Sequence, residues 1–406
     1  MNIIFLTLYR IEDIEERKLY PDLMRKFRDE GHQVYIVTPC ERRLGLETSL
    51  VDNKGVHILN VKTLNIQKTN VAEKGIGTLL LERQFKAAIK KYLGGIKFDL
   101  ITYSTPPITF TNVVKYLKKK NPQAITYLQL KDIFPQNAVD IGMFGEKSVF
   151  NWYFRKKEKA LYMVSDFIGC MSPANVKFVL EHNPEIDAAR VEVAPNSIEL
   201  KDDDVLKDSG QLEAARLYIR KKYDLPLDKP VFIYGGNLGI PQGIDYLVKC
   251  LDTNKNRKDC YFVVVGSGTH YGLISEWYDK NQNHNVKLMQ ALPKSEYDTL
   301  VRTCDVGMIF LDHRFTIPNY PSRLLSYLEY KMPVVCATDV NTDIGKIAVE
   351  NGYGYWCESV KPEDFTVLVD KMLASDMKAM GERGYEFLKQ NYLVEHTYNA
   401  IMRHIK

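Results

Sequence analysis

The sequence has few of the features that mark membrane-spanning, secreted or metal-binding proteins. No uncharged apolar run reaches the roughly 18 residues that a spanning helix requires. The start, MNIIFLTLYR, has neither a basic region nor a small-residue cleavage site, so it predicts a first β-strand. The seven cysteines form no CxxC pair, and the eight histidines show no HxxH or HExxH spacing, which excludes the common zinc motifs.

The cysteines lie mainly in or beside apolar runs, as buried free thiols do. Free thiols fit a reducing compartment, so we expect a cytoplasmic protein. At 406 residues, with 45% hydrophobic and 26% charged residues, the chain is long enough for two globular domains.

Strand-like apolar runs alternate with helical patterns throughout, which predicts α/β units with parallel sheets. In the first half the predicted strands are Ile3–Leu8, Gln33–Thr38, Val56–Val61, Leu100–Tyr103, Ile125–Leu130, Phe167–Met171 and Val191–Val193. In the second half they are Val231–Tyr234, Tyr261–Val265, Val286–Met289, Val306–Leu311, Val334–Cys336 and Gly354–Trp356.

A polar segment, Lys201–Gly210, separates the two series and predicts a linker. Its Asp202–Asp204 run does not end a strand, so we interpret it as solvated charge rather than a metal-binding DxD motif. The predicted organisation is a domain over residues 1–198, a linker over 199–212, a domain over 213–388 and a C-terminal helix over 389–406. Two placements of that last helix stay open, on the second domain or back on the first.

Charge is divided unevenly between the halves. Residues 1–200 carry 29 Lys and Arg against 23 Asp and Glu, and the remainder carries 26 against 28. Nine of the cations lie between Arg83 and Lys120, where Asp99 is the one acid, and Lys118–Lys120 end a predicted helix. Two interpretations stay open: a solvated surface, or a surface that meets anionic lipid or a phosphorylated acceptor. Nucleic acid is disfavoured because no aromatics interleave with these cations.

A second segment, Asn151–Lys157, joins aromatic and cationic side chains. This composition suits an interfacial helix. It also suits an ordinary helix whose aromatic side chains fill the core of the first domain, which is the interpretation we favour.

Glycine-rich segments follow two predicted strands of the second domain. The first, Tyr234–Gly239, precedes a predicted helix at Ile244–Cys250, and the second is Gly266–Gly268. A glycine turn between strand and helix lets backbone N–H groups approach a phosphate. The alternative is a turn that merely packs tightly. Neither segment is GxGxxG, so a dinucleotide fingerprint is not supported.

The stretch from Ile317 to Val335 predicts a proline-stiffened loop, an N-cap at Ser322 and a helix with Arg323 in its first turn. A cation is unfavourable in a first turn unless an anion offsets the helix dipole, so Arg323 indicates a diphosphate partner. The alternative is a surface arginine whose side chain points into solvent.

Five motifs in order resemble the retaining glycosyltransferase family 4 of GT-B fold, in its WbuB-like branch of O-antigen and capsule enzymes. They are GHQVYIVTP at 31–39, KDIFP at 131–135, APNS at 194–197, YGGNLG with Gln242-Gly243, and PSRLL at 321–325. The resemblance implies an α/β, GT-B fold in which two Rossmann-like domains face a central cleft, with acceptor binding in the first domain and donor binding in the second.

This chain departs from the family pattern at several site positions. Asn237 and Gln242 stand where many members have Arg and Lys, and Lys131 falls where the family has a catalytic histidine. Ser326 replaces the ribose-binding glutamate, and Glu329, one turn later, is either a substitute or a solvated side chain. Arg323 is then the best remaining donor-site cation.

From the resemblance and these residues we predict catalytic roles for Lys131, Asp132 and Arg323, and neither a metal nor a cofactor. The predicted donor-binding residues are Gly235, Gly236, Asn237, Leu238, Gln242, Gly266, Ser267, Leu292, Pro321, Ser322, Leu324 and Ser326.

The predicted reaction moves a sugar from a nucleotide-diphosphate sugar, UDP-linked and with N-acetylated hexosamines among the options, to a lipid-linked or saccharide acceptor. The setting would be bacterial surface polysaccharide synthesis at the anionic inner face of the plasma membrane. The alternatives are a GT-B UDP-sugar epimerase and a non-catalytic nucleotide-sugar-binding scaffold.

Overall fold

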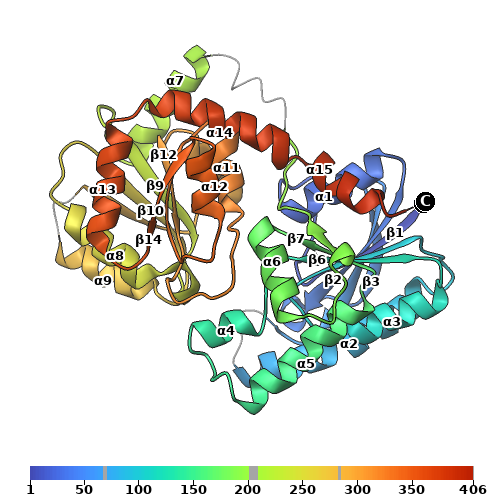
Figure 1. Ribbon diagram of the computed structural model, residues 1–406. Helices are drawn as coiled ribbons and strands as arrows, with labels where there is room; N and C mark the ends of the chain where they lie inside the picture. The colour runs from blue at the N-terminus through green and yellow to red at the C-terminus, as the bar shows by residue number, and fades with distance from the viewer. Residues whose placement is uncertain (67–70, 201–208, 282–284, 406) are drawn as a thin grey trace. The chain divides into compact units, whose positions relative to one another are not determined.

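The computed structural model describes residues 1–66, 71–200, 209–281 and 285–405, so Asp202–Asp204 lie outside the described residues. The chain divides into an N-terminal unit, Met1–Glu199 with Tyr392–Lys406, and a C-terminal unit, Leu200–Asn391. Each unit has a central sheet flanked by helices (Figure 1). In the described part of the chain, no helix is long and apolar enough to cross a bilayer.

The N-terminal unit holds a sheet with the strand order β3-β4-β2-β1-β5-β6-β7-β8. All neighbours are parallel except β3 and β4. The strands are β1 Asn2–Leu6, β2 Gln33–Glu41, β3 Ser49–Asn53, β4 Val56–Thr63, β5 Leu100–Ser104, β6 Ile125–Leu130, β7 Phe167–Cys170 and β8 Val191–Val193. The sequence analysis missed β3, which is an exposed edge strand of sequence SLVDN and has no apolar face to bury.

Helices cover both faces of this sheet (Figure 1). The segments are α1 Leu19–Asp29, η1 Arg42–Leu44, α2 Val71–Tyr92, α3 Thr111–Lys120, α4 Gln136–Asp140, α5 Val149–Val164, α6 Pro173–His182, η2 Ala188–Arg190 and α15 Val394–Met402. Helix α15 packs on α1, and on the other side α3 packs against both α2 and α5. Phe5, Phe27 and Ile401 belong to one buried apolar cluster, so the end of the chain completes this core.

The C-terminal unit holds a wholly parallel sheet with the strand order β11-β10-β9-β12-β13-β14. The strands are β9 Val231–Asn237, β10 Tyr261–Ser267, β11 Val286–Gln290, β12 Val306–Phe310, β13 Val334–Thr338 and β14 Gly354–Glu358. The helical segments are α7 Ser209–Lys222, η4 Ile240–Gln242, α8 Ile244–Asn254, α9 Tyr271–Lys280, α10 Lys294–Val301, α11 Arg323–Glu329, α12 Ile344–Glu350, α13 Pro362–Leu373 and α14 Met377–Asn391.

Two sequence expectations can be compared directly with this fold. All seven cysteines are buried and unpaired, which confirms the prediction of free thiols. The predicted C-terminal helix over residues 389–406 corresponds to α15, which is shorter and belongs to the N-terminal unit. Helix α14 ends at Asn391 and α15 begins at Val394, because Leu393 forms a parallel bridge with Ile198 instead of continuing a helix.

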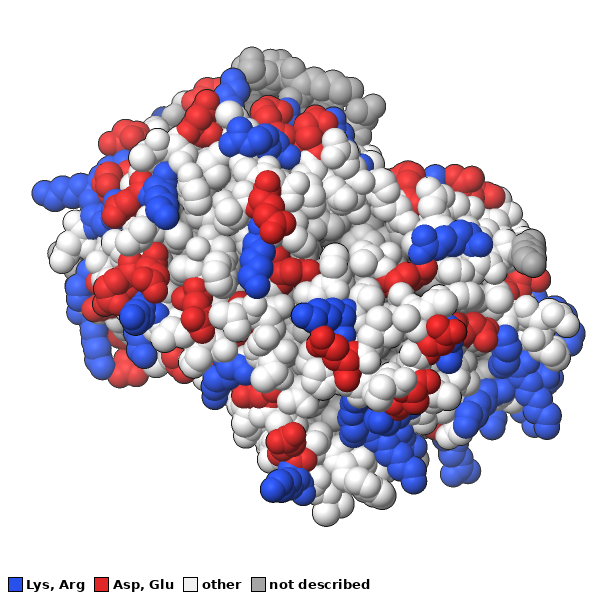
Figure 2. All heavy atoms as spheres, in the orientation of Figure 1, with Lys and Arg blue, Asp and Glu red and all other residues white. Residues whose placement is uncertain are grey.

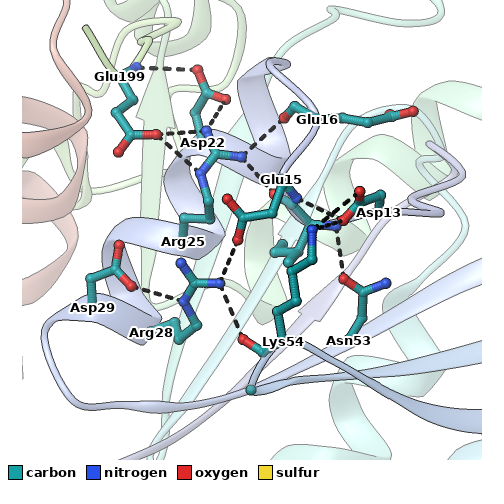
Figure 3. A network of polar contacts seen from close by, with 12 residues as sticks. Asp13, Glu15, Glu16, Asp22, Arg25, Arg28, Asp29, Asn53, Lys54 and Glu199 are labelled. Atoms are coloured by element: carbon teal, nitrogen blue, oxygen red, sulfur yellow. Dashed lines mark hydrogen bonds and ion pairs between the residues drawn. The ribbon is translucent and has the colours of Figure 1, made fainter. Parts of the chain in front are cut away.

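An ion network centred on the buried Arg25 side chain includes Glu199, the residue next to this bridge (Figure 3). Arg25, whose side chain is 3% exposed, donates from Nη2 to Asp22 Oδ1 at 2.7 Å and to Glu199 Oε2 at 2.6 Å. The Glu199 amide donates to Asp22 Oδ2 at 3.1 Å. Next to Glu199, the Ile198 amide donates to the Tyr392 carbonyl at 2.9 Å. The segments that enter and leave the C-terminal unit are thus fastened together.

Replacement of Arg25 tests this network. Arg25→Met leaves the carboxylate of Asp22 buried without its cation, so we expect a loss of about 3–5 kcal/mol in the free energy of unfolding. Arg28→Met is the matched control, because Arg28 pairs with Glu15 and Asp29 near the surface and should cost at most about 1 kcal/mol. Urea denaturation measures both. Equal losses would show that the buried pairs carry no special weight.

Candidate functional site

The first glycines of the predicted phosphate loop lie in a strand. Strand β9 extends to Asn237, and Gly236 pairs with Gly266 of β10. A Cβ on Gly266 would lie 2.0 Å from the Gly236 carbonyl oxygen, so glycine is required for this close approach. The expected turn at Gly235-Gly236 is therefore wrong, and the chain turns after Asn237.

Arg323, at the start of α11, packs against this glycine strand. Gly236 has a φ of 133°, and a Cβ there would lie 3.2 Å from Arg323 Nη2. The guanidinium carbon lies 4.3 Å from the centre of the Tyr234 ring, which is a cation–π contact. Its Nη1 is buried without a hydrogen-bond partner, and no described carboxylate pairs with it. The structure thus brings Gly236 and Arg323 together and leaves a buried donor that lacks an acceptor.

Three tyrosines surround the cation, and the sequence analysis assigned a role to none of them. Besides Tyr234, these are Tyr297 of α10 and Tyr327 of α11. A Cβ on Gly235 would lie 1.8 Å from the Tyr297 hydroxyl, and the Tyr327 hydroxyl donates to the Ile233 carbonyl at 3.2 Å. Burial raises the pKa of Tyr327 to about 12, so it stays a neutral phenol. Tyr327 could have been found from its spacing four residues after Arg323.

The predicted polar donors near the turn are already engaged. Asn237 Nδ2 donates to Gln242 Oε1 at 2.7 Å, and the Leu238 amide donates to the Ser267 carbonyl at 2.9 Å. The expectation that Asn237 and Leu238 offer free N–H groups to a phosphate does not match this arrangement. Gln242 accepts in this pair through Oε1, so its Nε2 hydrogens and the second Nδ2 hydrogen of Asn237 are the side-chain donors that the pair leaves for a ligand.

The other predicted donor-binding residues differ in exposure. Ser322 is exposed at the N-cap of α11 and its side chain makes no capping hydrogen bond, whereas Leu324 is fully buried. Ser267 is exposed at the end of β10, and Leu292, Pro321 and Ser326 are half-buried. The expectation of a solvated Glu329 is wrong, because that residue is 6% exposed. Asn319, in the loop before α11, carries a second buried donor, Nδ2, without a partner.

Lys131 and Asp132 follow β6 in the N-terminal unit. Lys131 Nζ donates to the carbonyls of Ala194 and Pro195, each at 3.2 Å, and Asn137 Nδ2 donates to Asp132 Oδ1 at 2.7 Å. Both backbone amides donate to Thr105 Oγ1. The two side chains therefore bind different partners and do not pair with each other.

Burial moves the pKa values of both side chains toward neutral pH. Desolvation lowers the pKa of Lys131 to about 7 and raises the pKa of Asp132 to about 6, against a smaller lowering by Asn137. Groups with pKa values near the working pH can hold or release a proton during a reaction. Within the described residues no group of three or more His, Cys, Asp or Glu is placed to hold a metal ion.

These features place the chain in a structural class. Two successive Rossmann-like units define the GT-B fold, and HepE of Anabaena, solved with UDP-glucose, shares it. The TM-score is 0.68, with 12% identity, over 100% of this chain and 99% of HepE. Residues 216–387, which lie in the C-terminal unit, match the family described as Glycosyl transferases group 1.

Two curated proteins are similar over part of the chain. WbjE of Pseudomonas aeruginosa, assigned as a glycosyltransferase, is 25% identical over 164 residues, which is 40% of this chain and 41% of WbjE. WcaI of Escherichia coli K12, assigned as a colanic acid biosynthesis glycosyl transferase, is 24% identical over 132 residues, or 32% of this chain and 31% of WcaI. Both matches span less than half of the relative's length.

The shifted pKa of Lys131 gives a pH dependence of stability. Folded Lys131 loses its proton near pH 7, but the unfolded chain keeps it until about pH 10.5, so the unfolded state binds more protons between these values. Stability relative to Lys131→Met should therefore rise with pH across this window, by up to roughly 1.4 kcal/mol per pH unit. Denaturation at a series of pH values measures this slope. The exposed Lys177→Met is the control; if it gives the same slope, the effect does not belong to Lys131.

Proposed function

We propose that this protein is a retaining glycosyltransferase that takes a UDP-linked sugar as donor and a lipid-linked or saccharide acceptor in bacterial surface polysaccharide synthesis. The observation that carries the proposal is Arg323, a half-buried arginine without an ion-pair partner, whose Nη1 is buried and whose guanidinium packs on Gly236 at the edge of the glycine strands. Support comes from the group 1 domain at 216–387 and from HepE, which was solved with UDP-glucose. Retention and family 4 rest on the motif resemblance alone.

The chemistry follows from where charge develops. The bond between the anomeric carbon and the diphosphate oxygen breaks with its electron pair on the diphosphate, and an acceptor oxygen bonds to the anomeric carbon. Arg323 Nη1 would donate to the departing diphosphate, because preorganised cations and N–H groups stabilise such charge most effectively in dry sites. Asp132 would take the acceptor proton, and Lys131 would orient the reacting sugars.

The direct test is a transfer assay. With a panel of UDP-sugars and a polyprenyl-diphosphate saccharide as acceptor, we expect sugar transfer with equimolar UDP release, in which the product keeps the anomeric configuration of the donor. We propose that transfer is metal-independent, so saturating EDTA should leave it intact. Conversion of the donor in the absence of any acceptor would support the epimerase, and donor binding without turnover would support the scaffold.

The role of Arg323 can be measured by calorimetry with UDP. Arg323→Ala removes a charge-assisted contact, so UDP affinity should fall by an amount equivalent to about 1.5–3 kcal/mol. The UDP affinity of Arg323→Lys should lie between those of the parent and Arg323→Ala, because lysine keeps the charge but not the planar fork of donors. The control is Arg383→Ala, which removes an exposed arginine bound to the Gly352 carbonyl and should leave affinity unchanged. UDP affinity equal to that of the parent in Arg323→Ala would refute the donor role.

We also propose that the N-terminal unit meets an anionic membrane. The expectation that the aromatics of Asn151–Lys157 fill the core holds only in part. Phe154 packs 4.9 Å from the Phe134 ring, but Trp152 is 64% exposed, and Phe150 and Val149 just before it are 67% and 78% exposed. Lys156 Nζ lies 5.5 Å from the centre of the Trp152 ring. Exposed aromatics beside cations suit a bilayer interface, which vesicle cosedimentation of Trp152→Ser would test.

A further inference from the structure

A groove lies between α2 and α3 of the N-terminal unit, and none of the donor and acceptor residues described above lines it. It has a volume of about 570 Å³, and its lining includes Arg83, Lys86, Lys115, Lys119, Tyr116 and Leu79. In Figure 2, Lys and Arg gather at the lower right of the view, over the position of α2 and α3 in Figure 1. The groove is therefore a concave part of a basic surface.

The cations of this groove are not neutralised by the protein. All four are exposed, and none forms an ion pair with a described carboxylate. The lining also contains one acid, Glu82, whose two oxygens accept from the backbone amide and the side-chain amide of Asn112. Glu82 keeps its negative charge but pairs with none of the four cations, which outnumber it. Four like charges around one concavity repel one another, so an anion that enters it would relieve that repulsion.

By contrast, Lys118, which lies on α3 together with Lys115 and Lys119, forms contacts within the fold. Its Nζ donates to the Ala124 carbonyl at 2.6 Å and to Asp166 Oδ2 at 2.7 Å. The basic stretch thus divides into cations that are paired within the fold and cations that face the groove. This difference argues against an evenly solvated basic surface.

Tyr116 supplies a second, independent observation. Its hydroxyl is buried in the groove wall without a hydrogen-bond partner, although buried hydroxyls are normally paired. The Lys86 ammonium lies 5.4 Å from the centre of the same ring, and the Lys120 ammonium lies 5.9 Å from it. The ring therefore holds two ammonium groups beside the groove, and ammonium groups are suited to phosphate oxygens.

Apolar side chains on α2 indicate what carries the phosphate. Leu79, which lines the groove, is 61% exposed, and Ile76 and Leu80 on the same helix are 54% and 38% exposed. A free phosphate does not explain exposed apolar side chains beside the cations, but a phospholipid does, because its headgroup and acyl chains are joined.

We propose that the α2–α3 groove binds the phosphate of an anionic phospholipid, with Leu79, Ile76 and Leu80 against the acyl region. This site gives the proposed membrane association a specific headgroup contact and rests on that part of the proposed function. It is distinct from the donor site at Arg323, so the two can be tested separately.

The test compares two double variants with the same change in charge. Lys86→Gln with Lys115→Gln removes groove cations, and Lys90→Gln with Lys91→Gln removes exposed cations of the same basic stretch that do not line the groove. Binding to vesicles of phosphatidylglycerol and phosphatidylcholine should fall about ten-fold or more for the groove pair and only about two-fold for the control pair. Leu79→Ser should also weaken vesicle binding.

The remaining arms separate the sources of phosphate and the two proposals. Millimolar glycerol 3-phosphate should compete weakly, and pure phosphatidylcholine vesicles should bind poorly. Equal losses for the two double variants would overturn the groove site in favour of general charge attraction. Tight binding of glycerol 3-phosphate without any effect of Leu79→Ser would overturn the lipid assignment in favour of a soluble anion. A parent protein that binds the vesicles but transfers no sugar would instead contradict the proposed activity.

Discussion

The buried guanidinium of Arg25 secures the place where the chain leaves the N-terminal unit. It bonds to Asp22 within α1 and to Glu199, the last residue of the N-terminal unit before the crossing. Ile198, beside Glu199, pairs with the segment that brings the chain back at Tyr392. Removing the buried charge of Arg25 would leave the buried carboxylate of Asp22 unpaired. The network therefore constrains the crossing at Glu199 directly and the crossing at Tyr392 through Ile198.

The donor region depends on a different constraint, the absence of side chains on adjacent strands. Gly236 and Gly266 allow β9 and β10 to pair to their ends, and Gly235 leaves room for the Tyr297 ring. The surface that remains is backbone, and Arg323 lies on it. A desolvated arginine that lacks a carboxylate partner destabilises the fold. Such residues are common at sites where a ligand supplies the missing negative charge.

The outer helices of the N-terminal unit show how one basic stretch can serve two purposes. Lys118 binds a carboxylate and a backbone carbonyl and so secures α3, whereas Lys115 and Lys119 line the α2–α3 groove unpaired. The aromatic residues near the start of α5 divide in the same way. Phe154 packs against other rings, and Trp152 stays exposed. Side chains that stabilise the fold and side chains that stay exposed and unpaired are therefore close neighbours on these helices.

The sequence by itself determined the α/β class, thirteen of the fourteen strands in the described part of the chain and the buried free cysteines, because apolar runs and their spacing are local properties. It missed β3, whose stability comes from pairing with β4 rather than from an apolar pattern. Only the tertiary structure decided that Asn237 pairs with Gln242, that Glu329 is buried, and that Arg323 lies against Gly236 with an unpaired donor. The first of these depends on the path of the turn after β9, and the other two depend on how α11 faces the sheet and on contacts between residues distant along the chain. A local pattern of residue types does not specify them.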